Sequence, residues 1–360
     1  HQNLTADEAA ERIDAGEKYV IRFKTPREGT TTVRDRLRGE INVENRTLDD
    51  YILVKSDGWA LYHLAAMVDD HLMNVTHVIR GSEWLPSLPL HSLICRALDF
   101  NEPEWIHLSI FLKPSGKGKM SKRETADLVK DGVSFFIKDL EDLGYLPEAV
   151  VNWVALMGWS YDDHTEFFTM EDLVEKFSLD HLNPAPAAIN YTKLDHFNGL
   201  HIRNLSDADL ANRIQPFFTA RGFKTTNEVL LKIAPIIKER MATLDESVDL
   251  AGFFFEEEVS PETEEIIQKG LTITDTIQIA KDVLGILLSG ASIEKDVVEP
   301  RMREYVETSG FTAGQVFGIM RTAITGQRVS PPLFESMEIV GREKVLSRME
   351  NAISKMSQSS

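Results

Sequence analysis

One short part of the sequence constrains the fold more than any other, because its hydrophobic period changes twice. Val75–Arg80 is an apolar, strand-like run, Leu88–Leu98 carries apolar residues along one helical face, and Ile106–Leu112 is strand-like again. A strand, a helix and a strand in direct succession predict a βαβ unit with two parallel strands. Ligands of such sheets bind beyond the carboxyl ends of the strands. We therefore expect functional residues in 80–84 and in 113–123, which follow those ends.

The residues before this unit predict a small α+β module. Thr5 and Glu8 are spaced as a helix capping box, and Gly16 suits the left-handed residue that ends a helix. Tyr19–Lys24 alternates apolar and charged residues, which indicates a half-buried strand. Further short strands are expected at 41–43 and 51–55.

The chain after residue 130 has helical patterns nearly throughout. Residues 134–143 form a helical segment before Gly144, and Pro147 is placed to begin the next helix, 147–157. Apolar residues recur at helical spacing further on: Leu230, Ile233, Ile236, Ile237, Met241 and Leu244; Val316, Ile319, Met320 and Ala323, before Gly326; and Val345, Leu346, Met349 and Ile353. The expected fold class is therefore α/β plus all-α, with two or three domains in 360 residues.

Charge and composition exclude several classes of protein. The net charge of −18 argues against a nonspecific nucleic-acid binder. Residues 241–300 hold 14 acidic and 3 basic residues, whereas residues 301–360 hold 6 and 8, so a polyanion should prefer the C-terminal segment. The single cysteine, Cys95, excludes an internal disulfide and a cysteine zinc cluster, and we expect no zinc. Without a long apolar run or a signal peptide, the chain is expected to be cytoplasmic.

The segment 113–123 is the most unusual stretch, because it carries five cations and no acid in an acidic chain. Its glycines and its proline indicate a loop. Composition alone favours a solvated basic loop. A Walker-type phosphate loop is excluded, since the pattern Gly-x-x-x-x-Gly-Lys-Ser/Thr is not matched. The functional interpretation that remains is a flexible cationic clamp for phosphate groups.

The order Lys119-Met120-Ser121-Lys122-Arg123 resembles the KMSKS signature of class I aminoacyl-tRNA synthetases. The surrounding sequence resembles one family of that class, the bacterial-type glutamyl-tRNA synthetases, in order and spacing. The segments that carry this resemblance are 55–58, 62–65, 68–71, 79–85, 144–149, 156–159, 197–199, 323–326 and 332–335. The resemblance covers essentially the whole chain. It implies an AMP-forming glutamate–tRNA ligase that uses ATP with Mg²⁺.

The resemblance also implies roles for single residues near the βαβ unit. Tyr62 and Arg80 match glutamate-binding positions, and a guanidinium suits a carboxylate because it can donate two parallel hydrogen bonds. The positions around ATP are Glu83, Trp84, Leu112, Lys119, Met120, Ser121, Lys122 and Arg123. Lys122 and Lys119 are the expected catalytic residues, since a lysine on a closing loop can stabilise a breaking triphosphate. The structural alternatives are an ion pair at Arg80, a half-buried aromatic at Tyr62, and core positions at Leu112 and Met120.

Four residues in the C-terminal half match family positions that meet anticodon bases: Arg240, Arg321, Ser330 and Leu333. Arg321 lies off the apolar stripe of its helix, so it can face outward. Arg240 borders the acidic stretch 241–300, where it could instead serve as an ion-pair partner.

The resemblance divides the chain into four units. Residues 1–61 resemble the end of the acceptor-stem-binding insertion, 62–115 the second half of the Rossmann catalytic domain, 116–202 the stem-contact domain with the KMSKR loop, and 203–360 the helical anticodon-binding domain. Two features depart from the family. Ala66, four residues after Tyr62, stands where many relatives carry a polar residue. The HIGH signature, with which the family binds ATP in the first half of the Rossmann fold, has no counterpart in this sequence.

The missing signature leads us to expect an N-terminally incomplete chain that is inactive alone. The alternative is a noncatalytic tRNA-binding protein derived from the same family. The expected partners are tRNA-Glu, glutamate and ATP, and the expected state is a monomer.

Overall fold

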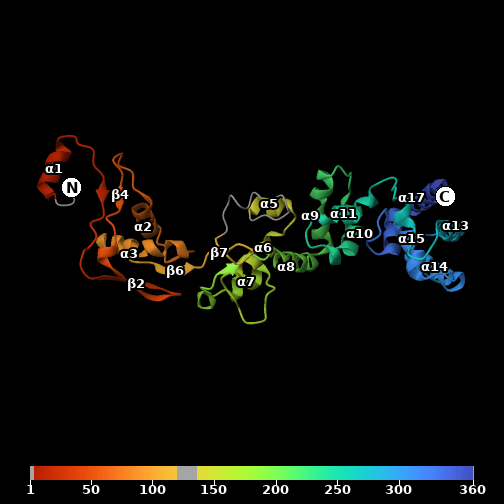
Figure 1. The fold of residues 1–360 in the computed structure, drawn as a ribbon, viewed down its shortest axis with the longest axis horizontal. Coiled ribbons are helices and arrows are strands. Elements are labelled where there is room, and N and C mark those ends of the chain that lie inside the picture. The colour runs from red at the N-terminus through yellow and green to blue at the C-terminus, as the bar shows by residue number, and fades with distance from the viewer. Residues whose placement is uncertain (1–3, 120–135, 360) are drawn as a thin grey trace. The chain divides into compact units, whose positions relative to one another are not determined.

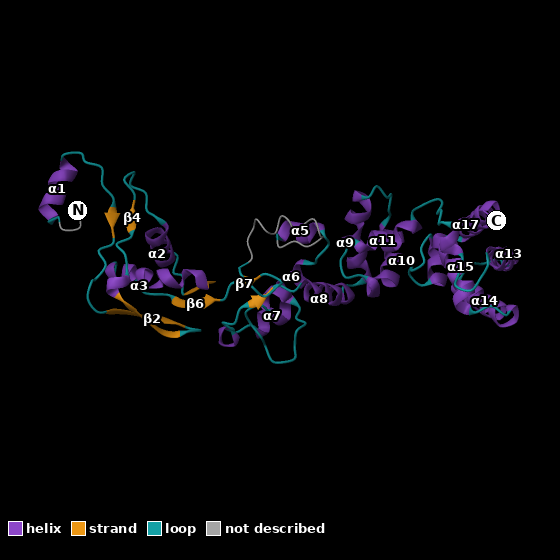
Figure 2. Ribbon diagram, viewed as in Figure 1, coloured by secondary structure: helices purple, strands orange, loops and turns teal. Residues whose placement is uncertain are grey.

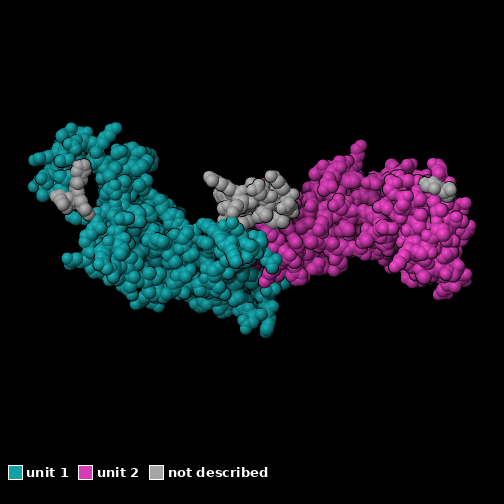
Figure 3. Space-filling view, in the orientation of Figure 1, with its two compact units in different colours: residues 1–124, 154–190 teal, residues 125–153, 191–360 magenta. Residues whose placement is uncertain are grey.

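The computed structural model of the chain describes residues 4–119 and 136–359. The chain divides into two compact units, shown in different colours in Figure 3. One unit contains residues 1–124 and 154–190, and the other contains residues 125–153 and 191–360. Each unit has buried hydrophobic clusters of its own. None of the helices in the described ranges combines the length and apolarity needed to cross a bilayer.

The first unit is built on a four-stranded sheet in the order β3-β2-β6-β5. Strand β2 (Thr30–Asp35) pairs antiparallel with β3 (Gly39–Glu44) and parallel with β6 (Glu104–Leu108), and β6 pairs parallel with β5 (His77–Gly81). Helices α2 (Tyr62–Leu72) and α3 (Leu88–Ala97) pack together, and α3 also contacts β2 (Figure 2). Val33, Leu88, Ile94 and Trp105 are buried between these elements. The strands β2 and β6 therefore place residues 30–44 in the same sheet as residues 77–108.

The predicted βαβ unit is confirmed as β5, α3 and β6, with the two strands parallel. One detail of the prediction is wrong, because the segment 106–112 is not one strand. Strand β6 ends at Leu108, and a separate two-residue strand, β7 (Phe111–Leu112), pairs parallel with β8 (Ala187–Ala188). The strand is interrupted at residues 109–110. As a result β7, which leads into the basic loop, belongs to a different sheet from β6.

The N-terminal helix, α1 (Ala6–Asp14), is confirmed with its capping box, in which the Thr5 side chain accepts from Glu8 N–H. Gly16 follows with φ of +80°. The predicted half-buried strand at 19–24 is wrong in its burial. Only β1 (Ile21–Arg22) forms, antiparallel to β4 (Ile52–Val54), and Tyr19, Val20 and Ile21 are exposed. The alternating pattern therefore reflects a two-stranded ribbon and not one face of a core.

The rest of the first unit is a smaller cluster of short elements. Trp159, Phe168 and Leu173 form its buried centre, with α7 (Met170–Lys176) beside them. The ring centroids of Trp159 and Phe168 lie 5.4 Å apart at an interplanar angle of 64°. Much of the stretch 156–190 is turn and irregular chain, so the prediction of nearly continuous helix is wrong there.

The second unit is helical in its described residues (Figure 1). Its helices are α5 (Ile137–Asp142), α6 (Pro147–Ala155), α8 (Tyr191–Asn204), α9 (Asp207–Ala220), α10 (Asn227–Ile237), α11 (Glu246–Ala251), α12 (Thr263–Ile266), α13 (Ile273–Ser289), α14 (Lys295–Ser309), α15 (Ala313–Thr325), α16 (Leu333–Val340) and α17 (Arg342–Ser359). The stripes predicted on α15 and α17 are confirmed, since Val316, Ile319, Val345 and Met349 are fully buried. The first stripe is not one helix, because α10 ends at Ile237 and Met241 is buried from a loop.

A buried asparagine ties three segments of the second unit together. The Asn198 side chain accepts from Leu146 N–H at 2.7 Å and donates to the Ala242 carbonyl at 2.6 Å. Gly144, just before Leu146, has φ of +83°, and a Cβ there would lie 2.6 Å from the Leu244 nitrogen. The loop before α6 therefore approaches residues 242–244 so closely that only glycine fits at position 144.

We expect Asn198→Ala to lower the free energy of unfolding by about 2 kcal/mol or more, because buried backbone groups of Leu146 and Ala242 would lose their partners. Urea denaturation followed by circular dichroism measures this. The matched control is Asn351→Ala, at an exposed position of α17, which should change stability by no more than about 0.5 kcal/mol. Equal stability of the two variants would contradict the structural role of Asn198.

Candidate functional site

Arg80 occupies the centre of a polar cluster in the first unit. It lies on β5, and the parallel register of β5 and β6 places it directly beside His107. Its Nε donates to His107 Nε2 at 3.0 Å, and its Nη1 lies 3.1 Å from His91 Nδ1 on α3. The predicted βαβ unit thus supplies all three residues, two from its strands and one from its helix.

Each of these histidines contacts a further polar group. His107 Nδ1 lies 2.7 Å from Asp35 Oδ2 at the end of β2, and both side chains are fully buried. Asp35 also accepts the backbone N–H groups of His107, Leu37 and Arg38. His91 Nε2 lies 2.9 Å from His63 Nδ1 on α2. The result is a continuous row of contacts from Asp35 through His107, Arg80 and His91 to His63.

Burial keeps the three rings in this row neutral. Desolvation lowers the pKa of His91 to about 3, with the nearby Arg80 charge as the next cause. Burial also lowers the pKa of His63 and of His107, although the hydrogen bond from His107 to Asp35 opposes the shift in His107. We take the His107–Asp35 contact as neutral imidazole with carboxylate, because Arg80 donates to the other ring nitrogen.

Aromatic rings enclose the Arg80 guanidinium. Its carbon lies 5.2 Å from the ring centroid of Trp105 and 5.8 Å from that of Trp84, distances at which a cation is attracted to a ring face. The Tyr62 ring lies 4.8 Å from that of Trp84. The structure therefore brings together three of the predicted site residues, Tyr62, Arg80 and Trp84.

Arg80 has no carboxylate partner within ion-pair distance among the residues that the structure describes. Its Nη2 is buried and makes no hydrogen bond within that set, although the Tyr62 hydroxyl lies near enough to favour the charged guanidinium. Burial is the main cause that lowers the pKa of Arg80. Asp70 and Asp35 favour the charge of this half-buried side chain from beyond ion-pair distance, and an anion that arrives from outside could add a direct contact.

The residues predicted around ATP lie partly beside this cluster. Lys119 Nζ contacts Glu83 Oε1 at 2.8 Å, and this ion pair lowers the pKa of Glu83. Leu112 forms an antiparallel bridge with Lys119, so the segment 113–118 is a closed loop with its ends side by side. Met120, Ser121, Lys122 and Arg123 lie outside the described residues.

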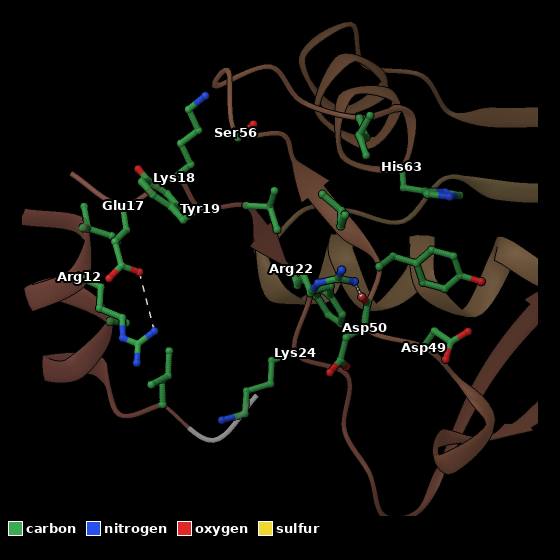
Figure 4. Close-up of a pocket in the computed structure, with 18 of the residues that line it drawn as sticks. Arg12, Glu17, Lys18, Tyr19, Arg22, Lys24, Asp49, Asp50, Ser56 and His63 are labelled. Atoms are coloured by element: carbon green, nitrogen blue, oxygen red, sulfur yellow. Dashed lines mark hydrogen bonds and ion pairs between the residues drawn. The ribbon is translucent and has the colours of Figure 1, made fainter. Parts of the chain in front are cut away.

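A cleft of about 1250 Å³ lies in the N-terminal part of the same unit, between α1 and the β1–β4 ribbon (Figure 4). Its lining is mixed in charge, with Arg12, Arg22 and Lys24 against Glu17 and Asp50. His63, the last group in the row that begins at Asp35, also lines this cleft. Across the described ranges, no cluster of three or more His, Cys, Asp or Glu could hold a metal ion.

The predicted anticodon residues lie in the second unit and are not equally accessible. Arg321 is half-buried, and its Nη1 donates to the Ser330 hydroxyl at 2.9 Å and to the carbonyls of Ser330 and Pro331. Ser330 and Leu333 are buried. Arg240 is exposed, and no ion pair of it occurs in the described ranges. Burial, and then the charge of Arg240, lowers the pKa of Arg321, so the two cations lie near one another.

Sequence reasoning missed Asp35, His91 and His107. His107 could have been found from the predicted pair of parallel strands, because in the observed register it is the neighbour of Arg80. Asp35 carried no such signal, since β2 alternates exposed and buried positions but buries polar Thr31 and Asp35.

Known proteins resemble the chain along nearly all of its length. Residues 1–196 match the family described as tRNA synthetases class I (E and Q), catalytic domain, and residues 209–353 match the anticodon binding domain family. The glutamate–tRNA ligase of Dehalococcoides mccartyi is 39% identical over 347 residues, which are 95% of this chain and 70% of that protein. The same ligase of Flavobacterium johnsoniae is 39% identical over 98% of this chain and 71% of its own length.

Two solved structures are also similar. The crystal structure of a glutamate tRNA ligase from Elizabethkingia meningosepticum, in complex with its amino acid, superposes with a TM-score of 0.86 and 31% identity, over 98% of this chain and 72% of that one. The glutamate–tRNA synthetase of Elizabethkingia anophelis gives a TM-score of 0.83 at 31% identity, over 98% and 71%.

The neutral His91 ring makes stability depend on pH. The unfolded chain takes up a proton at this residue below about pH 6.5, whereas the folded protein does so only near pH 3. The unfolded state therefore binds more protons between these values, and the free energy of unfolding should fall as pH drops from about 6.5, by up to roughly 1.4 kcal/mol per pH unit for this group.

We expect His91→Gln, which cannot titrate, to reduce that slope. Urea denaturation at several pH values from 7 to 4 measures it. His196→Gln, at an exposed position of α8, is the matched control for the substitution itself. Identical slopes in wild type and His91→Gln would show that the ring is not held neutral.

Proposed function

The chain belongs to the family of class I tRNA synthetases (E and Q), and from this membership we propose that it is a glutamate–tRNA ligase. In this proposal it activates glutamate with ATP as the Mg²⁺ complex and passes the glutamyl group to the terminal adenosine of tRNA-Glu. We also propose that it acts as a monomer in the cytoplasm.

The observation that carries the proposal is the unpaired charge of Arg80. Its side chain is half-buried, two of its donors are occupied by neutral rings, and the buried Nη2 has no partner among the described residues. A carboxylate of glutamate would supply the missing negative charge and accept from Nη2, with Tyr62 beside it. Ala66 is apolar and partly buried on the same helix as Tyr62, so it offers the substrate no side-chain hydrogen bond.

The proposed ATP site lies around the basic loop. Glu83, Trp84, Leu112 and Lys119 would surround the nucleotide together with Met120, Ser121, Lys122 and Arg123. Lys119 is exposed and held only by a surface ion pair with Glu83, and such pairs are weak. A triphosphate can therefore draw Lys119 away from Glu83 at little cost. Lys122 would then stabilise the negative charge that develops as the α-phosphate is attacked by the glutamate carboxylate and pyrophosphate leaves.

The second candidate function is a noncatalytic tRNA-binding protein of the same family. The exposed Arg240 and the half-buried Arg321 favour tRNA binding under either proposal. Only the enzyme proposal gives a function to the Nη2 donor of Arg80, because binding of tRNA alone does not use an amino-acid site.

Charging of tRNA-Glu with radiolabelled glutamate, by the full-length product of the gene, tests the proposal. We expect Lys122→Ala to abolish charging. We expect Arg80→Ala to reduce kcat/KM for glutamate by roughly two to three decades, because losing a buried charge partner costs about 3–5 kcal/mol, and to leave the KM for ATP nearly unchanged. Arg46→Ala, at an exposed position, is the control.

No charging by the wild-type protein would favour the noncatalytic alternative. An unchanged glutamate kcat/KM in Arg80→Ala would remove Arg80 from the amino-acid site.

We propose that residues 203–360 bind the anticodon, within the four-part division 1–61, 62–115, 116–202 and 203–360. Arg240 and Arg321 lie near one another, and neither has an acidic partner among the described residues. Repulsion between two such cations would be relieved by RNA. In this proposal the buried Ser330 orients Arg321 through its hydroxyl, and the buried Leu333 supports the turn that carries Ser330.

We expect Arg321→Ala and Arg240→Ala each to weaken binding of tRNA-Glu by about 1–3 kcal/mol, with a much smaller loss for a tRNA whose anticodon is altered. Filter binding to both tRNAs across a salt series measures this. Arg203→Ala, on α8, is the control. Equal losses on both tRNAs, with a lower salt slope, would make the two arginines electrostatic anchors and not readers of bases.

A further inference from the structure

The hydrogen bonds around Arg80 permit only one placement of their protons. A guanidinium donates and never accepts, so His107 Nε2 and His91 Nδ1 must both present lone pairs to it. Each ring is then protonated on its other nitrogen or not at all. Because neutral imidazole carries exactly one N–H, the proton of His107 is on Nδ1 and that of His91 is on Nε2.

Both remaining contacts agree with this placement. His107 Nδ1–H faces Asp35 Oδ2 at 2.7 Å, where a carboxylate can only accept. His91 Nε2–H faces His63 Nδ1 at 2.9 Å, so His63 accepts there and carries its own proton on Nε2. Every donor in the row meets an acceptor. A second proton on His91 or His107 would place an N–H group of the ring against an N–H group of Arg80, and neither group could accept a hydrogen bond.

The row also fixes where the guanidinium points. Nε and Nη1 are held from two different elements, β6 and α3, and the ring centroids of Trp84 and Trp105 lie 5.8 and 5.2 Å from the guanidinium carbon. Two donors held in this way leave Nη2 as the buried donor with no partner in the described part of the chain. Asp35 stays one ring away from the guanidinium, and no carboxylate of the described residues forms an ion pair with Arg80, although Asp70 and Asp35 favour its charge from a greater distance.

We propose that His91 and His107 are positioning residues of Arg80, which hold it as neutral acceptors in fixed tautomers and reserve Nη2 for a substrate carboxylate. This inference rests on the proposed function for the identity of the carboxylate, which is glutamate. The tautomers themselves do not depend on it. Acceptors without charge are essential here, because an acidic residue in either place would neutralise Arg80 and compete with the substrate.

The first test reads the tautomers directly. Long-range ¹H–¹⁵N correlation spectra of the full chain labelled at histidine, without ligand at about pH 6.5, distinguish the two neutral tautomers from each other and from the cation. We expect His107 to be protonated on Nδ1, and His91 and His63 on Nε2. A doubly protonated ring, or a proton on Nδ1 of His91, would overturn the proposal whatever the protein binds.

The second test compares two replacements of His91 by calorimetric titration with glutamate and, separately, with ATP. Asn can place its oxygen where Nδ1 lies, whereas Leu fills similar space and cannot accept. We expect His91→Leu to lower glutamate affinity roughly 10- to 100-fold and His91→Asn to stay within about threefold of wild type. ATP affinity should be unchanged in both. His71→Leu, on the exposed part of α2, is the control.

His107→Gln extends the comparison, since the amide oxygen of glutamine can occupy the Nε2 position. His107→Leu is avoided, because it would leave Asp35 without the hydrogen bond from His107 Nδ1. A folded His91→Leu with wild-type glutamate affinity would overturn the positioning role. Absence of glutamate binding by the wild type, with the expected tautomers, would instead refute the proposed function and the assignment of the ligand.

Discussion

A half-buried guanidinium that has no ion-pair partner among the described residues is the constraint on which the candidate site depends. Two tryptophan rings lie near Arg80, and burial alone would disfavour its charge. Two neutral imidazole rings offset this cost by accepting hydrogen bonds from the guanidinium. The register of β5 and β6 lets His107 accept from Nε, and the position of α3 lets His91 accept from Nη1. Asp35 adds its negative charge from one ring away. In the sheet order β3-β2-β6-β5, β2 lies next to β6, and this brings Asp35 within hydrogen-bond distance of His107.

Two other arginines show the same principle with different outcomes. Arg348 is buried in the second unit, and its Nη1 and Nη2 donate to the carbonyls of Ile324, Phe253 and Glu256, while its buried Nε has no hydrogen-bond partner among the described residues. That arrangement is structural. Arg321 uses only Nη1 for Ser330 and Pro331. All three arginines are held by neutral acceptors. Both terminal nitrogens of Arg348 donate to backbone carbonyls, whereas Nη2 of Arg80 has no partner among the described residues.

The sequence predicted part of the local structure, and the family resemblance singled out Arg80, which lies at the centre of the polar cluster. The βαβ unit, the capping box at Thr5 and the helical stripes on α15 and α17 follow from short-range periods, and these are confirmed. Strand β2 was missed because its buried face carries Thr31 and Asp35, so its pattern is not hydrophobic. His107 and His91 were missed because their importance comes from register and helix placement, which a single sequence does not specify. The exposure of residues 19–21 was missed because an exposed two-stranded ribbon shows the same alternation of apolar and charged residues as a half-buried edge strand.

A crystal structure of the full-length protein with bound glutamate would test the central claim most directly. The account predicts that a glutamate carboxylate oxygen lies within hydrogen-bond distance of Arg80 Nη2, while Nε and Nη1 keep their contacts with His107 and His91. Glutamate bound away from Nη2, or an Arg80 side chain that leaves either histidine to reach it, would contradict the account.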